Sequence, residues 1–294
     1  MKKILLIISM VLAWSNIQAQ SFSKDVVPII SAGGPGGINA QIIQALQPVI
    51  SNILGVQVPI DYKAGAGTMV ALNHITSAGK ERNTLMVTVW APSKHNLLTD
   101  VKPVLHLGES SKIMFVRADA NIKSVHDLLT NKSKFTVGVS SPLQTEIWLN
   151  AARHHNPKHE ITLVPYRSGI EVITAVLGGH IDVGETPGSA LLSFIADNRL
   201  IPIANVSTQR SNVLPNVPTL QEQTGWKYEG WPYLSWFLFA SLGTDDETVL
   251  SLRRHLSEYV RSQEGKNFLA KFDLNFSNQT FDKPEIVLRN IQSK

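Results

Sequence analysis

The sequence predicts an α/β protein built as two domains with a ligand cleft between them. Runs rich in β-branched residues alternate with helical patterns, which is typical of parallel sheets covered by helices. The 294 residues suit one large domain or two modest ones. A glycine-rich loop follows each of the first two runs, at the carboxyl ends of strands, where α/β sheets bind ligands. Two domains that share one cleft form the simplest architecture with these features.

The N-terminal residues 1–19 have the features of a signal peptide. Residues 1–3 carry two lysines, residues 4–14 form an apolar run, and Ala19 is a small residue suited to signal peptidase. The apolar run is shorter than the roughly 20 residues that a membrane-spanning helix needs. We therefore expect cleavage after Ala19 and a periplasmic protein. Cleavage would remove two lysines and no acidic residue, so the net charge of +4 falls to +2 and gives no reason to propose nucleic acid or an anionic membrane as a partner.

The elements follow from composition and spacing, in order along the chain. Enrichment in Val, Ile and Thr predicts strands at residues 25–31, 57–62, 84–89, 112–117, 135–140, 161–166, 181–184 and 201–207. Apolar residues at 3.6 spacing predict helices at residues 38–54, 69–77, 125–129, 145–154, 169–177, 189–196, 245–261 and 264–272. The aromatic-rich stretch 226–240 is assigned no element. We expect one domain to comprise residues 20–121 and 233–294, and the other residues 122–232.

Two glycine-rich loops predict an anion-binding site. The first, GGPGG at 33–37, follows an apolar strand and precedes a helix, so backbone N–H groups face outward. The second, KAGAGT at 63–68, has the same design and leads into the helix from Met69. Taken singly, each loop is more typical of a tight turn. Two of them in consecutive turns would direct two positive helix ends into one crevice, which favours anion binding.

A nucleotide-binding enzyme fits these loops less well. Asp61 ends the second strand, where a ribose-binding carboxylate would stand. However, both loops lack the third glycine of the dinucleotide fingerprint, and no Gly-Lys-Ser/Thr follows either of them. An α/β enzyme that uses Asp61 therefore stays a minor alternative.

Hydrolytic and metal chemistry are also weakly indicated. The stretch Gly138-Val139-Ser140-Ser141-Pro142 lacks the final glycine of a nucleophile elbow, so Ser140 and Ser141 either contact a ligand or cap the next helix. The histidines at 154–155 and 159 flank an Asn-Pro turn, and the chain has no cysteine. We expect no metal, no cofactor and no disulfide.

Several segments resemble the periplasmic substrate-binding receptors of tripartite tricarboxylate transporters, the Bug receptors. These segments occur in the same order as in the family and extend over nearly the whole mature chain. The most specific ones are VPYRSG with LGGHIDV, and LPNVPTLQE. The others are GGPGGINAQII, YKAGAGT, DVKPVLHLGES, SVHDLL and SWFLFASLGTDDETVLSLRRHL.

The resemblance implies a two-domain "Venus flytrap" periplasmic binding protein without catalysis. Such a receptor closes on a small organic anion, a carboxylate, and delivers it to the membrane permease subunits of a tripartite tricarboxylate-type transporter. A ligand sensor that partners a membrane kinase is the alternative that the receptor sequence leaves open. We expect a monomer.

The resemblance also implies which residues contact the ligand. The loops would bind a carboxylate through backbone N–H groups, and the second domain would add hydroxyl and charged groups. Arg167 would meet a second carboxylate or pair with Glu171 four residues on. Asp182 is expected to be structural, because an anion would avoid it. The implied contacts are Gly34, Pro35, Gly36, Gly37, Ala66, Gly67, Thr68, Ser140, Ser141, Gln144, Tyr166, Arg167, Glu185 and Thr186.

The chain departs from the family pattern in both loops. The family's usual aspartate and arginine are replaced by Gly37 and Gln41, and Thr68 stands where a glycine is usual. The loop at 140–145 is shorter and lacks the usual glycines. Loss of the aspartate removes an acceptor for a cationic amine, which disfavours an amino acid as the ligand.

Overall fold

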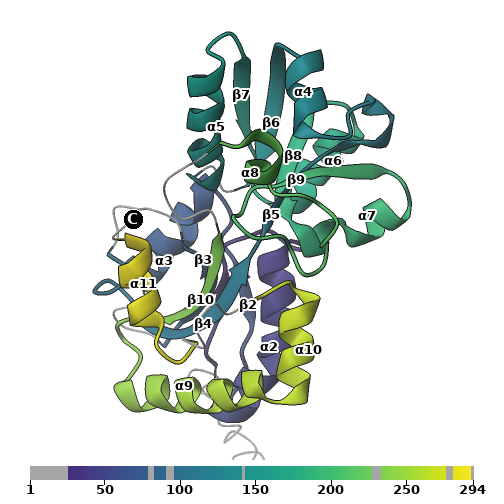
Figure 1. Cartoon of the computed structure of the whole chain (residues 1–294). Helices are drawn as coiled ribbons and strands as arrows, with labels where there is room; N and C mark the ends of the chain where they lie inside the picture. The colour runs from purple at the N-terminus through teal and green to yellow at the C-terminus, as the bar shows by residue number, and fades with distance from the viewer. Residues whose placement is uncertain are drawn as a thin grey trace, which may run out of the picture.

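The computed structural model describes residues 26–78, 83–90, 96–140, 143–226, 233–275 and 281–292. It contains two five-stranded sheets, and each has helices packed on it (Figure 1). The expected signal peptide lies outside the described residues. No helix in the described part is long and apolar enough to span a membrane.

The first sheet has the order β2-β1-β3-β10-β4 and occupies the lower half of Figure 1. Its strands are β1 (Ile29–Ser31), β2 (Ile60–Tyr62), β3 (Leu85–Val89), β4 (Lys102–Ser110) and β10 (Leu234–Ala240). Strand β1 pairs in parallel with β2 and β3, whereas β10 runs antiparallel to β3 and β4. The accompanying helices are α2 (Ile38–Leu54), η1 (Ala66–Thr68), α3 (Met69–Ala78), α9 (Asp246–Arg261), α10 (Gln263–Lys271) and α11 (Pro284–Gln292).

The second sheet has the order β7-β6-β8-β5-β9. Its strands are β5 (Lys112–Arg117), β6 (Lys134–Val139), β7 (Glu160–Pro165), β8 (Val183–Pro187) and β9 (Leu200–Asn205). Strand β5 is antiparallel to both β8 and β9, and β6 is parallel to β7 and β8. The accompanying helices are η2 (Ala118–Ala120), α4 (Val125–Asn131), α5 (Leu143–His155), α6 (Gly169–Leu177), η3 (Gly188–Leu191), α7 (Leu192–Ala196) and α8 (Leu220–Thr224).

The α/β fold class is confirmed, and the sheets are mixed rather than parallel as the alternation indicated. Each sheet contains an antiparallel strand, β10 in the first and β5 in the second. The domain boundary was expected after residue 121, but the change from one sheet to the other comes earlier in the chain, because β5 belongs to the second sheet. The chain passes from the first sheet to the second at Ser111, between β4 and β5.

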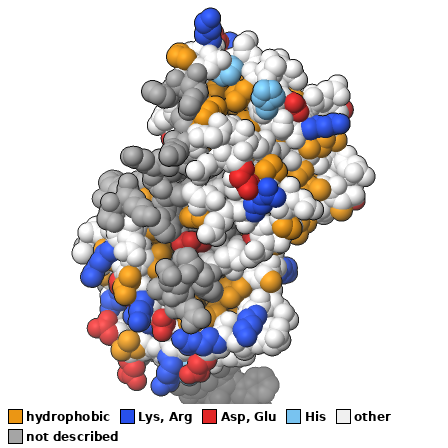
Figure 2. Space-filling model, viewed as in Figure 1, with side chains coloured by type: hydrophobic (Ala, Val, Ile, Leu, Met, Phe, Trp, Pro, Cys, Tyr) orange, Lys and Arg blue, Asp and Glu red, His pale blue; other side chains and the backbone are white. Residues whose placement is uncertain are grey.

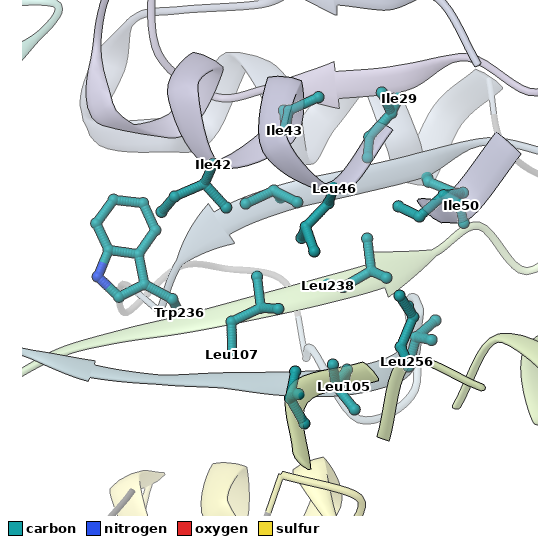
Figure 3. Packing of buried hydrophobic residues seen from close by; sticks show 14 of the residues in the cluster. Ile29, Ile42, Ile43, Leu46, Ile50, Leu105, Leu107, Trp236, Leu238 and Leu256 are labelled. Carbon is teal, nitrogen blue, oxygen red and sulfur yellow. The ribbon is translucent and has the colours of Figure 1, made fainter. Parts of the chain in front are cut away.

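A buried core fixes helix α2 against the first sheet (Figure 3). The helix buries Ile42, Ile43, Leu46 and Ile50, which recur at three- and four-residue spacing, among residues of the strands such as Leu238. Each such side chain contributes on the order of 1.5–3 kcal/mol by leaving water. This packing sets the direction of α2, and therefore the place of its N-terminus.

The second sheet holds α5 and α6 in the same way. Trp148 of α5 packs with Val137 and Val183 of strands β6 and β8. Helix α6 buries Val172 and Ile173 in a separate cluster that includes Phe115 of β5. The first turns of these helices are thereby fixed relative to strand β5, which follows the passage between the sheets.

Candidate functional site

A cavity lies between the two halves of the molecule, the first half being the first sheet with its helices and the second half the second sheet with its helices. The space between them is about 640 Å³ when the part open to solvent is included. The first half contributes Ala32, Gly33, Gly37, Ile38, Asn39, Gly65, Gly67, Thr68, Val89, Leu234 and Trp236 to its lining. The second half contributes Lys112, Ser140, Tyr166, Arg167, Ser168, Gly169 and Pro187.

Three helices begin at this cavity. Gly37 precedes α2, Thr68 precedes α3, and Ser168 precedes α6, and all three residues line the space. Neither α2 nor α3 has an acidic residue in its first turn, and Gly37 provides no side-chain cap. The positive ends of α2 and α3 therefore favour an anion in the cavity, whereas α6 is capped by Ser168 and has Glu171 in its first turn.

The two glycine loops reach the cavity with different backbone geometry. In the first, the Gly37 N–H donates to the Gly34 carbonyl (3.1 Å), and Gly36 has a positive φ of 76°. In the second, residues 65–68 all have positive φ, including Thr68 at 79°. A threonine is strained in this region, so the second loop holds a conformation that its own sequence disfavours.

Two buried polar atoms in the cavity lining have no protein partner. They are the Thr68 Oγ1 and the Asn39 Oδ1. Thr68 is 7% exposed, so its hydroxyl is largely withdrawn from bulk water. Because buried polar groups are normally hydrogen-bonded, both atoms indicate where a ligand or its water would bind.

Lys112, the first residue of β5, brings a buried positive charge to the cavity. Its Nζ lies 3.1 Å from Glu185 Oε2 and donates to Thr145 Oγ1 (2.7 Å). The Thr145 hydroxyl donates to Glu185 Oε2 (2.6 Å), and Trp148 Nε1 donates to Glu185 Oε1 (2.7 Å). Burial lowers the pKa of Lys112, and the Glu185 carboxylate opposes that shift.

Arg167 pairs with Glu171, one of the two partners expected for it. Its NH2 group lies 2.9 Å from Glu171 Oε1, and its Nε donates to the same oxygen (3.0 Å). The Arg167 side chain is 73% exposed, so it lines the cavity from the solvent side. Lys112 and Arg167 are the cations of the described lining, which contains no carboxylate residue.

Apolar residues of the first half form one wall of the cavity. Val89, Leu234 and Trp236 come from neighbouring strands of the first sheet. Trp236 Nε1 donates to Ser110 Oγ (2.8 Å) next to the passage between the sheets, which fixes the indole. The cavity therefore combines charged or polar groups for orientation with an apolar surface for the body of a ligand.

The structure brings some of the sequence-predicted contacts to the cavity and separates others. Gly37, Gly67, Thr68, Ser140, Tyr166 and Arg167 line it. Gly34, Pro35 and Ala66 belong to the two loops without being part of the described lining, while Gly36 and Thr186 line a second hollow beside α6. Ser141 and the side chain of Gln144 lie outside the described residues.

Glu185 has a different place from the one expected. It is fully buried, and both carboxylate oxygens bind protein groups, so it faces Lys112 and α5 rather than the described lining of the cavity. Lys112 and Asn39 were missed by the sequence reasoning. A lysine directly before the apolar run 113–116 was the available indication for Lys112.

Asp182 forms local contacts in the second sheet. It accepts hydrogen bonds from the Thr136 N–H and hydroxyl (both 2.9 Å) and pairs with Lys132. Burial alone would raise the pKa of Asp182, but the bonds from Lys132 and Thr136 outweigh burial and lower it. Asp182 is absent from the described cavity lining.

The enzyme alternatives find little support at these positions. Asp61 pairs with Lys63 (3.2 Å) and is not part of the described lining. Neither a histidine nor a carboxylate residue occurs in the described lining, which contains Ser140. On the face in Figure 2, acidic and basic side chains intermingle over the lower half and form no one-sign patch.

Comparisons with known proteins identify the family and the fold. The family model described as tripartite tricarboxylate transporter family receptor matches residues 42–286. Protein BugT of Bordetella pertussis is 23% identical over 289 residues, covering 90% of this chain and 86% of BugT. The solved structure of the periplasmic binding protein BugD matches with a TM-score of 0.78 at 15% identity, covering 92% of this chain and 94% of that one. MatC from Rhodopseudomonas palustris with bound malate matches with a TM-score of 0.77 at 17% identity, covering 92% and 97%.

Proposed function

The chain belongs to the tripartite tricarboxylate transporter family of receptors, and from that premise we propose that it captures a small organic carboxylate and delivers it to a permease of the same transporter type. Receptors of this family are periplasmic binding proteins. The proposed route begins with export through the cleavable segment at residues 1–19. The captured anion then passes to the membrane subunits without chemical change.

One observation carries the carboxylate assignment. The N-termini of α2 and α3, which have no acidic residue in their first turns, meet at a cavity whose described lining contains two cations and no carboxylate residue. Backbone N–H groups and helix dipoles bind an anion there without a metal or cofactor. The malate bound to MatC is an example of such an anion in a protein of the same fold.

Binding and closure are coupled in this proposal. A ligand in the cavity would touch Gly67 and Thr68 from one half and Tyr166 and Ser168 from the other. Contacts with both halves are complete only when the halves are close together, so the ligand shifts the population toward the closed form. Opening at the permease then releases it.

Thermal unfolding of residues 20–294 tests this proposal. The probes are mono-, di- and tricarboxylates, aromatic acids, amino acids and phosphate. A ligand at 100 times its Kd adds about 2.7 kcal/mol to the free energy of unfolding, which raises the Tm measurably. Small-angle scattering should show a more compact protein with the same ligand. The proposal is contradicted if no carboxylate raises the Tm and denatured protein releases no bound anion in mass spectrometry.

A matched pair of variants locates the site. Gly67 has a φ of 57° and lines the cavity, whereas Gly55 has a φ of 66° at the C-terminus of α2. An alanine costs about 1 kcal/mol of stability at either position, because both φ values are positive. We expect Gly67→Ala to weaken carboxylate binding and Gly55→Ala to leave it unchanged.

A separate experiment tests delivery of the ligand to the permease. Carboxylate uptake is measured in vesicles that contain a tripartite tricarboxylate-type permease, with and without the receptor.

A further inference from the structure

A loop of the second half reaches the first half at a buried contact away from the cavity. Ser211, in the loop between β9 and α8, donates its hydroxyl to Asp273 Oδ2 (2.6 Å), and Asp273 follows α10 of the first half. Each of these two residues is 1% exposed. Beside them, Asn212 Nδ2 donates to Asn275 Oδ1 (2.5 Å). The two halves are therefore joined at this point by hydrogen bonds rather than by the chain itself.

The loop that carries Ser211 is fixed to the second half at two points. Arg210 Nε lies 3.0 Å from Glu222 Oε2 of α8. Val213 packs on η3, with its Cγ2 3.4 Å from the position that a Cβ would take at Gly188. A movement of the second half therefore carries this loop with it.

Asp273 is equally well fixed to the first half. Its neighbour Asn275 exchanges two backbone hydrogen bonds with Glu109 of β4 (2.8 and 2.9 Å). A Cβ at Gly108 would lie 3.1 Å from the Asn275 carbonyl oxygen, so the segment packs closely on β4. Asp273 itself has a φ of 55°, in the left-handed region that aspartate and asparagine accept more readily than most residues.

The contact lies in one row with the two places where the chain crosses between the halves. Glu109 pairs with Ser235 of β10 on one side and with Asn275 on the other. The chain leaves the first sheet at Ser111, two residues after Glu109, and β10 begins at Leu234, one residue before Ser235. A bend about the line through these three neighbouring segments leaves the third contact in place. A twist of one half against the other pulls it apart.

The Asp273 carboxylate is the centre of the contact. Burial raises the pKa of this carboxyl, against the opposing effect of hydrogen bonds from the Ser211 and Asn275 side chains and from the backbone of Asn212 and Val213. A buried carboxylate without such partners is costly. The contact therefore favours the relative placement of the halves at which all these donors meet.

We propose that Asp273 is a positioning residue for ligand capture, because its contact with Ser211 is a third hinge connection that lets the halves bend toward each other and opposes twisting. This inference rests on the proposed receptor function. Neither residue belongs to the described cavity lining, so both act on binding through the placement of the halves. A cavity built from two halves binds tightly only at one placement, and every other placement lowers the fraction of protein that is competent to bind.

The variant Asp273→Asn tests the contact with little change of shape. Asparagine accepts a left-handed backbone, but its Nδ2 cannot accept a hydrogen bond, so it serves fewer of the donors. Ser211→Ala removes the same bond from the other half. The matched control is Asp182→Asn, which makes the same replacement at a carboxylate bound by Thr136 and Lys132 of its own half. Unfolding curves show that the variants fold.

Spin labels report the placement of the halves without a ligand. The chain has no cysteine, so Ala196→Cys on α7 and Lys266→Cys on α10 place one label on an exposed position of each half. These two helices lie on the same side of the molecule in Figure 1. Pulsed electron paramagnetic resonance should give a broader distribution of label distances with Asp273→Asn or Ser211→Ala than without them. The Asp182→Asn control should leave the distribution unchanged.

Calorimetric titration with succinate and with adipate measures the consequence for binding. A hinge variant that populates the binding placement about fivefold less should show a Kd about fivefold higher. The Kd of Asp182→Asn should stay within about twofold of wild type, because its halves keep their placement.

Three results would overturn the inference and leave the receptor function standing. The first is an unchanged distance distribution in folded Asp273→Asn and Ser211→Ala. The second is equal broadening in Asp182→Asn, and the third is unchanged carboxylate affinity despite broader distances. Failure of wild-type protein to bind any carboxylate would instead reject the receptor function, while the label distances would still decide whether the contact restrains the halves.

Discussion

Gly37 of the first glycine loop lies against Ser168, the residue that caps α6 in the opposite half: a Cβ at position 37 would lie 3.6 Å from the Ser168 Cβ. The first turns of α2 and α6 are therefore neighbours although they belong to different sheets. Ser168 accepts a hydrogen bond from the Glu171 N–H, whereas Gly37 gives α2 no side-chain cap. A charge placed at residue 37 would act on both helix ends at once.

Gly37→Asp should weaken ligand binding and leave stability nearly unchanged. Its φ of −72° and ψ of 164° suit a helix N-cap, but glycine is itself only a few tenths of a kcal/mol worse than aspartate there, and the new Cβ would lie 3.1 Å from the Gly34 carbonyl oxygen, so the free energy of unfolding should change by less than about 0.5 kcal/mol. The same charge would repel a bound carboxylate and lower its affinity by about fivefold or more. Chemical denaturation and calorimetric titration measure the two effects.

Gly37→Ser is the matched variant for this prediction. It adds a Cβ and a capping oxygen without a charge, and both variants meet the same Gly34 carbonyl, 3.1 Å from the Cβ position. It should change the free energy of unfolding by less than about 0.5 kcal/mol and keep its carboxylate affinity within about twofold. Equal loss of affinity in the two variants would assign the effect to bulk and reject the electrostatic explanation.

Thr68→Gly should also separate stability from binding. Thr68 has a φ of 79°, which glycine adopts without strain, so the variant should gain about 1 kcal/mol of stability. It loses the buried Oγ1 that has no protein partner, and carboxylate affinity should fall by about fivefold to tenfold. Thr68→Ser keeps the hydroxyl and should bind like wild type. Unchanged binding by Thr68→Gly would mean that the hydroxyl does not contact the ligand.

Helices with local start and stop residues could be predicted closely from the sequence. Helix α2 has the predicted bounds because Gly37 precedes its apolar spacing and Gly55 ends it in a left-handed conformation. Strands β4 and β10 were missed because they are buried almost throughout and show no alternation. Helix α11 was missed although Pro284 starts it and apolar residues recur at helical spacing.

In the candidate site, too, features that are local in the sequence could be predicted and contacts between distant residues could not. The glycine loops are contiguous in the sequence, so their position after two strands could be predicted. Lys112 could not be placed, because its partners come from α5 and β8 and only the folded chain joins them. The choice between two partners for Arg167 likewise needed the structure, which pairs it with Glu171.

Asp182→Asn should lower stability without changing ligand binding. The variant weakens the bonds from Thr136 and removes the ion pair with Lys132, so the free energy of unfolding should fall by about 1–2 kcal/mol. Glu160→Gln, which breaks the exposed pair with Lys134 in the same sheet, should cost less than about 0.5 kcal/mol. Denaturant unfolding measures both. A large loss of carboxylate affinity in Asp182→Asn would contradict its structural role.

His106 should make the fold sensitive to mild acid. It is 1% exposed on β4 beside Phe237, and burial, opposed by a backbone hydrogen bond with Gly108, lowers its pKa from 6.5 to about 4. Between these values the unfolded chain takes up a proton that the folded protein does not, so stability falls as pH falls from 6.5 to about 4, by up to about 3 kcal/mol. Above pH 6.5 this group has no effect. His106→Phe keeps a ring against Phe237 and cannot titrate, so the difference in free energy of unfolding between wild type and variant should change across this window and be constant above it. A difference that stays constant from pH 7.5 to 4 would show that His106 keeps an ordinary pKa in the folded protein.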